Sequence, residues 1–312
     1  MRRRGLIAVA ARGRVELLDL ATCHLTVRRA MGATRVRFSP DGRWLAYVHP
    51  VRGNPGDVSV VPVGGGAPRS PLHGDIVAWS WARAGERLYG LTAGGSLVTA
   101  SPRSRRRSER APRGAPASVA SFGLSPDGHR LAVNRSRCGR QSPNGELDTV
   151  NVRTGARVVA LRQPGRYLTF AGWTADGRWL LYFPATQCSA SLAADGWALD
   201  AVPAAGGTPV QAVGHMLLFD DLRSWCGQDL IAAAGPDRET ETGSALVATA
   251  PPAWRERTIQ PARRLSWTSP ACAPSGRLLA AAAGPGNAPV TFGLEHRSIW
   301  LLRPGGRILR RL

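Results

Sequence analysis

The stretch FSPDGRWLAYV, from Phe38 to Val48, decides the fold of this chain. Its segment Ser39-Pro40-Asp41-Gly42 is typical of a type I turn, because Pro presets φ at the second position, Ser suits the first and Gly accepts the fourth. The residues on both sides are rich in β-branched and aromatic types, which favour a half-buried pleated surface. The stretch therefore predicts a tight hairpin between two strands.

The pattern of this hairpin returns along the whole chain. Clear copies are GLSPDGHRLAV, GWTADGRWLLYF and ACAPSGRLLAA, and weaker ones begin at Trp79 and Arg223. The leucine that follows each turn recurs at intervals of 43, 43, 49, 50 and 49 residues. We interpret the turn residues as structural, since turn capping explains their carboxylates better than a catalytic array does: Pro40, Asp41, Gly42, Pro126, Asp127, Gly128, Asp176, Gly177, Pro274 and Gly276.

A repeat of this length indicates a propeller blade or another repeat unit, and we expect an all-β propeller. Each unit reads as four antiparallel strands, and the copies spread over residues 1–312, so we expect a single propeller domain. The tally favours seven blades, of which the first lacks its first strand; six blades with a surplus N-terminal segment is the alternative. The first strand of each unit should line the central channel, and apolar second strands such as Leu180 to Phe183 should be buried on both faces.

The Ser-Pro-Asp-Gly units, each followed by a further strand and a glycine turn, resemble the WD40-like (PD40) repeats of TolB-type β-propellers. This resemblance covers nearly the whole chain, and three units keep the Asp-Gly pair. It implies a bacterial, extracytoplasmic or cell-envelope module that binds proteins. The chain shows no convincing signal peptide, because the apolar run after MRRR is only about six residues against the roughly 7–15 expected. No apolar run is long enough for a transmembrane helix.

The formal net charge is +20, and all 41 basic residues are arginine. The absence of lysine indicates a GC-rich coding sequence, while the charge itself favours anionic partners. The densest basic run, Pro102 to Arg110, reads as a charged outer edge strand, with an anionic docking site as the alternative. The six histidines show no metal-ligand spacing, so we expect neither a metal nor another cofactor.

Two of the five cysteines, Cys138 and Cys188, follow equivalent leucines of neighbouring repeats. They should occupy equivalent loops on adjacent blades, which makes them a candidate disulfide. Such a bridge would indicate an oxidising compartment. Two unrelated residues in polar loops is the alternative.

The loops between the second and third strands of each unit should meet on one face and form the natural binding surface. We assign a partner-binding role there to Arg52, Arg135, Arg137, Arg140, Glu146, Asp148, Glu295 and His296. No catalytic motif is present, so the sequence predicts a monomeric, non-catalytic propeller that binds another protein on this face. The alternatives are a hydrolase or lyase with its site in the central funnel, and a module that binds polyanions.

Overall fold

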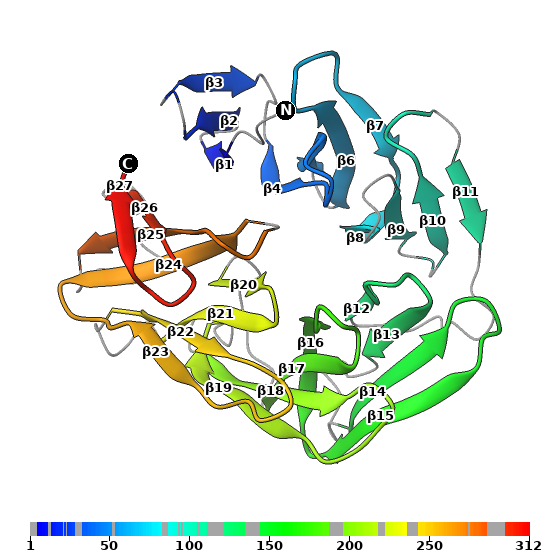
Figure 1. Ribbon diagram of the computed structural model, residues 1–312. Coiled ribbons are helices and arrows are strands. Elements are labelled where there is room, and N and C mark those ends of the chain that lie inside the picture. The colour runs from blue at the N-terminus through cyan, green and yellow to red at the C-terminus, as the bar shows by residue number, and fades with distance from the viewer. Residues whose placement is uncertain are drawn as a thin grey trace. The chain divides into compact units, whose positions relative to one another are not determined.

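The computed structural model is built from antiparallel β-sheets (Figure 1). It describes residues 5–11, 14–20, 22, 24–28, 33–51, 54–82, 87–92, 94, 96–104, 107–110, 121–134, 144–186, 196–217, 222–235, 243–273, 275–285 and 297–312. Within these residues there are seven sheets, six of four strands and one of three. The protein is thus a seven-bladed β-propeller, and the alternative of six blades is wrong.

The strands follow one another in chain order within each sheet. The first two sheets contain β1 (Leu6–Ala11), β2 (Arg14–Asp19) and β3 (Leu25–Arg28), then β4 (Thr34–Phe38), β5 (Trp44–Val51), β6 (Asn54–Pro62) and β7 (Arg69–Leu72). The next two contain β8 (Ile76–Trp81), β9 (Leu88–Thr92), β10 (Leu97–Ala100) and β11 (Arg107–Arg110), then β12 (Ser121–Leu124), β13 (Arg130–Asn134), β14 (Asn144–Asn151) and β15 (Arg157–Pro164). The last three contain β16 (Tyr167–Trp173), β17 (Trp179–Ala185), β18 (Trp197–Pro203) and β19 (Val210–Met216), then β20 (Arg223–Cys226), β21 (Asp229–Ala234), β22 (Ala245–Thr249) and β23 (Arg257–Gln260), then β24 (Leu265–Cys272), β25 (Leu279–Pro285), β26 (Ser298–Leu302) and β27 (Ile308–Arg311).

The hairpin turn predicted from Ser39 to Gly42 is confirmed. The Gly42 amide donates to the Ser39 carbonyl at 2.8 Å, and Gly42 adopts a φ of 67°. The Ser39 hydroxyl donates to the Asp41 carboxylate, which in turn accepts the Arg43 amide at 3.1 Å. The side chains of the motif therefore hold the turn closed, as their structural interpretation requires.

The same arrangement recurs at the turns of the fourth and fifth sheets. The Asp127 carboxylate accepts hydrogen bonds from Ser125 and the His129 amide, and Asp176 has the corresponding partners Thr174 and Arg178. Partial burial alone would raise the pKa of both carboxyls, but these hydrogen bonds hold each pKa below its ordinary value. Of the predicted turn residues, Pro274 lies outside the described part of the chain.

The first sheet, β1–β3, has three described strands where the others have four. These strands correspond to the second, third and fourth of a repeat unit, so the predicted incomplete first blade is confirmed. The prediction of fully buried second strands is confirmed as well: Leu180, Leu181, Tyr182 and Phe183 of β17 are each at most 1% exposed. No helix in the described ranges has the length and apolar character to cross a bilayer.

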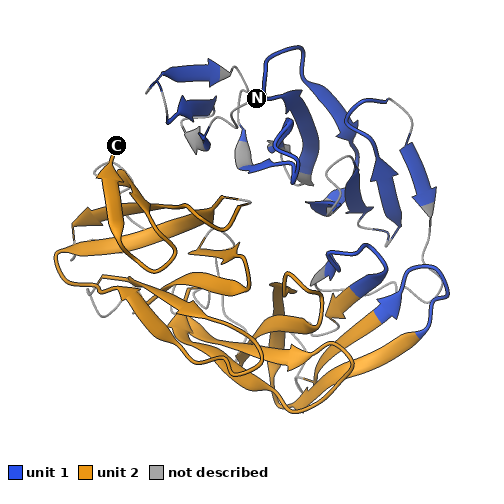
Figure 2. Cartoon of the chain, viewed as in Figure 1, with its two compact units in different colours: residues 1–118, 123–131, 150–156 blue, residues 119–122, 132–149, 157–312 orange. Residues whose placement is uncertain are grey.

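The chain divides into two compact units (Figure 2). Unit 1 comprises residues 1–118, 123–131 and 150–156, and its core packs β5 and β6 against β8 and β9 through residues such as Val60 and Ile76. Unit 2 comprises residues 119–122, 132–149 and 157–312. One cluster of its core packs β14 and β15 against β17 and β18, around Leu147, Leu161 and Leu180. The candidate site described next lies wholly in unit 2.

Candidate functional site

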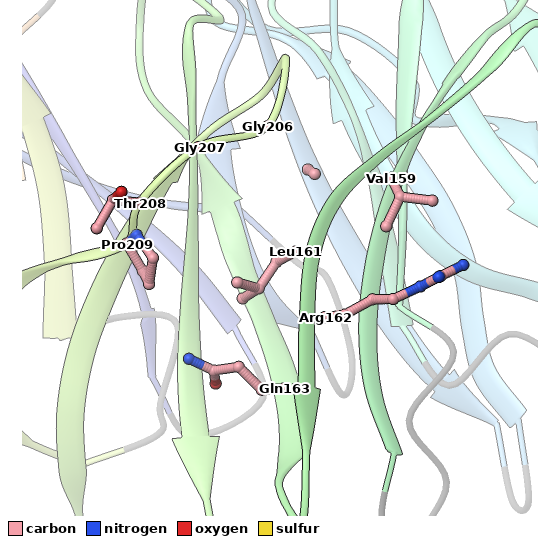
Figure 3. Close-up of a pocket in the computed structure, with 9 residues that line it drawn as sticks. Val159, Leu161, Arg162, Gln163, Gly206, Gly207, Thr208 and Pro209 are labelled. Atoms are coloured by element: carbon pink, nitrogen blue, oxygen red, sulfur yellow. The ribbon is translucent and has the colours of Figure 1, made fainter.

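A shallow depression of about 510 Å³ lies in unit 2, beside strand β15 (Figure 3). One wall is the run Val159 to Gln163 of β15, and the other is the segment Gly206 to Pro209 between β18 and β19. That segment is held by backbone hydrogen bonds, since the Gly206 amide donates to the Pro203 carbonyl at 2.9 Å. The depression therefore has walls of ordered backbone on both sides.

Gln163 connects the depression to the interior of unit 2. Its Nε2 donates to the Tyr182 hydroxyl at 3.4 Å. Its Oε1 is buried and has no hydrogen-bond partner among the described residues. An unsatisfied buried acceptor of this kind costs about 1–3 kcal/mol.

Tyr182 and Asp200 lie directly opposite each other on β17 and β18. Their side chains are hydrogen-bonded, with the tyrosine hydroxyl donating to the carboxylate. Burial raises the pKa of Asp200 to about 6, against the opposing effects of this hydrogen bond and of the Arg166 charge. Burial and the nearby Asp200 charge also raise the pKa of Tyr182 above its ordinary value, so the phenol stays protonated.

A carboxyl group with a pKa near 6 can accept or return a proton close to neutral pH. Arg166 is exposed and acts electrostatically on Asp200, so it also places a positive charge near any anion formed there. Asp200 and Arg166 supply a proton acceptor and a cation, while the buried Tyr182 hydroxyl donates to the Asp200 carboxylate and holds it in place. A base beside a cation is what proton abstraction next to a carboxylate needs.

The sequence reasoning missed Gln163, Tyr182 and Asp200. A signal for two of them existed, because Tyr182 and Asp200 are polar residues inside the otherwise apolar strands WLLYFPA and WALDAVP. A polar residue at a buried strand position needs a partner. The strand pairing that makes these two residues partners was not visible in the sequence.

Glu146 and Asp148 were assigned to a loop, but they lie in strand β14. Asp148 is fully buried, and its two carboxylate oxygens accept hydrogen bonds from Arg157 Nε at 2.7 Å and Nη2 at 3.1 Å. Glu146 accepts hydrogen bonds from Arg157 and, at 2.8 Å, from Arg162 Nε. Arg157 thus binds both carboxylates and Arg162 binds Glu146, and the buried Asp148 charge has the paired counter-charge that burial requires.

The other residues predicted to bind a partner lie outside the described residues: Arg52, Arg135, Arg137, Arg140, Glu295 and His296. The described part of the chain contains no cluster of three or more His, Cys, Asp or Glu side chains that could hold a metal ion.

The predicted cysteine pair, Cys138 and Cys188, also lies outside the described residues. The structure contains a different disulfide, between Cys226 and Cys272, with a Cα–Cα distance of 5.3 Å. Each cysteine ends the first strand of its sheet, β20 or β24. Cys226 lies four residues before the repeat leucine Leu230, whereas Cys272 lies seven before Leu279, so equivalence of repeat positions does not predict this pair.

Part of the basic run from Pro102 to Arg110 is described, and its strand β11 is the last of its sheet. Arg69 donates to the Arg103 carbonyl at 3.0 Å, and Arg107 donates to the His73 carbonyl at 3.2 Å. Arg107 also pairs with Glu109. These contacts tie the outer strands together, which supports the interpretation of the run as a charged edge.

Comparison with known proteins gives matches to solved structures only. No protein-family model matches the chain, and no curated protein does. An oligogalacturonate lyase in complex with manganese shares 12% identity over 99% of this chain and 86% of its own, with a TM-score of 0.65. The β-propeller domain of the Trilobed protease from Pyrococcus furiosus shares 11% identity over 99% of this chain and 95% of its own, with a TM-score of 0.59. The fold that this chain shares with these structures is a β-propeller.

The tricorn protease also matches, at 11% identity over 98% of this chain and a TM-score of 0.60. This chain spans only 34% of the length of that protease. The structural neighbours are mostly propeller enzymes, and acylaminoacyl peptidase is among them. The prediction of a non-catalytic binding propeller is therefore contradicted, and the comparison favours the alternative of a propeller enzyme.

Proposed function

We propose that this TolB-like propeller is an enzyme of the hydrolase or lyase class, in which Asp200 accepts the proton. The observation that carries the proposal is the pairing of Asp200 with Tyr182 across β17 and β18, with Gln163 linking Tyr182 to the depression. The similarity to propeller enzymes supports the fold of the proposed enzyme. The proposed chemistry is inferred from Asp200, Tyr182 and Gln163. The net charge of +20 favours an anionic substrate.

A lyase reaction suits these groups best, because elimination needs one base and no covalent nucleophile. In it, the ionised Asp200 would take the proton from a carbon next to the carboxylate of the substrate, and the C–H electrons would form the new double bond. The leaving oxygen would depart with its bonding electrons and take a proton from water. Arg166 would stabilise the negative charge that develops at the substrate carboxylate. The oligogalacturonate lyase match, which covers 86% of that chain, makes acidic oligosaccharides the first substrates to test.

The test measures turnover of two substrates. Turnover of oligogalacturonate is monitored by the absorbance of the unsaturated product, and turnover of an acidic peptide is monitored by the release of new amino groups. We expect turnover of one of them to rise with pH through about 6, because the base must be ionised. Asp200→Asn should reduce it at least about 100-fold, the lower range for general-base catalysis. Tyr182→Phe should move the midpoint to higher pH, since the hydrogen bond from Tyr182 lowers the pKa of Asp200.

The matched control is Asp229→Asn, which removes a carboxylate at the start of β21 in the same unit. It should leave turnover unchanged. Absence of turnover of both substrates by the unaltered chain, or full activity of Asp200→Asn, would refute the proposal. Size-exclusion chromatography of the same samples checks the further expectation that the chain is monomeric.

The same carboxyl makes a prediction about stability. The folded pKa of Asp200, about 6, lies above its ordinary value of 3.8, so the folded state binds more protons than the unfolded state between these pH values. Its contribution to stability is complete below pH 4 and is lost as the pH rises through 6. Asp200→Asn should therefore be more thermostable than the unaltered chain at pH 7 and no more so at pH 4. A difference in melting temperature between Asp200→Asn and the unaltered chain that stays constant from pH 4 to pH 7 would contradict the raised pKa of Asp200.

A further inference from the structure

The outer strand of the last sheet, β27, exposes its aliphatic side chains. Ile308 is 43% exposed and Leu309 is 39% exposed. The outer strands β7 and β23 bury theirs, since both Leu72 and Ile259 are buried. A register shift in the pairing of β26 with β27 leaves Leu309 without a residue opposite it. Two adjacent aliphatic side chains therefore face solvent at the edge of this sheet (Figure 1).

Two arginines meet at the start of this strand. Arg307 directly precedes Ile308, and Arg303 lies on the other arm of the β26–β27 hairpin. The Arg303 amide donates to the Arg307 carbonyl at 2.8 Å, so the two residues are neighbours across the hairpin. Both side chains are exposed, and like charges on opposite arms of a hairpin repel each other. An anion bound at this turn would relieve that repulsion.

The contacts that hold these arginines are to neutral groups. Arg303 Nη1 donates to a backbone carbonyl of the β24–β25 turn at 3.3 Å. Arg311, at the other end of β27, donates to the Ser298 hydroxyl at 3.0 Å and lies over the Trp300 ring. Within the described residues, none of Arg303, Arg307 and Arg311 forms an ion pair with an Asp or Glu side chain. Their charges are therefore available to an external anion.

Two other outer strands have one of these properties without the other. Strand β11 is charged but contains no apolar residue, and its Arg107 pairs with Glu109. Such an edge discourages strand pairing and needs no ligand. Strand β15 exposes Val158, but the adjacent Arg157 is neutralised by Asp148. Strand β27 instead combines exposed aliphatic side chains with arginines whose acidic partners are absent from the described residues.

We propose that β27 and the β26–β27 turn bind the surface of a membrane that contains anionic lipids. Such a surface offers phosphate groups to guanidinium groups and, directly beneath them, a hydrocarbon region for Ile308 and Leu309. Nucleic acid would satisfy the arginines but not the aliphatic pair, and proteins that bind single strands add aromatic rings on which bases stack. The aromatic ring beside this strand, Trp300, is instead covered by Arg311. The inference goes beyond the proposed enzymatic function and does not depend on Asp200.

The test measures co-sedimentation of the full chain with lipid vesicles. One set of vesicles contains phosphatidylcholine alone, and the other contains equal amounts of phosphatidylcholine and phosphatidylglycerol. We expect binding to the second set only. Arg303→Gln/Arg307→Gln should weaken this binding at least about 10-fold, because arginines near an anionic surface contribute individually to the attraction. Ile308→Ser should weaken it at least about 3-fold, because less apolar surface enters the hydrocarbon region.

Each variant has a matched control. Val158→Ser changes a side chain of similar exposure, 45%, beside a neutralised arginine. Arg87→Gln/Arg153→Gln removes two exposed arginines of unit 1. Both controls should bind like the unaltered chain, and melting temperatures check that all variants fold.

Three outcomes would overturn the inference. Equal loss of binding in Arg87→Gln/Arg153→Gln and Arg303→Gln/Arg307→Gln would show that net charge alone attracts the chain to vesicles. Full binding by Ile308→Ser would show that no aliphatic side chain enters the lipid. Displacement of the chain from the vesicles by a DNA oligonucleotide at the same phosphate concentration would make nucleic acid the favoured ligand.

Discussion

Replacing both Cys226 and Cys272 by serine should lower the free energy of unfolding by about 4 kcal/mol. The disulfide closes a loop with a sequence separation of 46 residues, and the chain-entropy relation gives about 4 kcal/mol for a loop of this length. The bridge also joins the first strands of two neighbouring sheets, β20 and β24, so these strands are no longer covalently linked in the variant. Chemical denaturation monitored by tryptophan fluorescence measures the effect.

The control for this prediction is the double variant Cys138→Ser and Cys188→Ser. It removes the pair that the sequence suggested, and a titration of free thiols in both double variants shows which cysteines are bridged. The Cys138→Ser/Cys188→Ser variant keeps three cysteines, Cys23, Cys226 and Cys272, and its free thiols are counted after unfolding without a reductant. We expect one free thiol there. Three would contradict the bridge between Cys226 and Cys272.

This disulfide also bears on the compartment in which the chain folds. Stable structural disulfides are typical of proteins that fold under oxidising conditions. We therefore expect chain produced in an oxidising compartment to have a higher melting temperature than chain produced under reducing conditions.

Gly306→Val should destabilise the chain by about 3 kcal/mol. Gly306 lies in the turn between β26 and β27 with a φ of 95°, a conformation that costs a residue with a side chain about 1–3 kcal/mol. A Cβ atom there would also overlap the Ile259 carbonyl oxygen, which belongs to β23 of the neighbouring sheet. Relieving that overlap costs about 1–3 kcal/mol more.

The adjacent glycine is the control for this substitution. A Cβ at Gly305 would meet no atom within 4 Å, so Gly305→Val should cost less than about 1 kcal/mol. Urea denaturation of the two variants measures the difference. Equal midpoints would show that the contact between the β26–β27 turn and β23 does not contribute to stability.

The repeat in the sequence was sufficient to predict the propeller, the seven units and the incomplete first sheet. Turn chemistry and strand alternation are local properties, so the SPDG hairpin around Asp41 and the buried strand from Leu180 to Phe183 were readable from neighbouring residues alone. The same locality explains the error at Glu146 and Asp148. Both read as polar loop residues because the arginines that bind them, Arg157 and Arg162, follow on the next strand.

Only the tertiary structure decided which distant residues became partners. Tyr182 and Asp200 are 18 residues apart, and their pairing depends on the register between β17 and β18. The Cys226–Cys272 bridge and the depression beside Gln163 depend in the same way on how neighbouring sheets pack. Local propensity determines the strands of each repeat, whereas the sites form where side chains from different strands and sheets meet, because their burial and pKa values are properties of that packing.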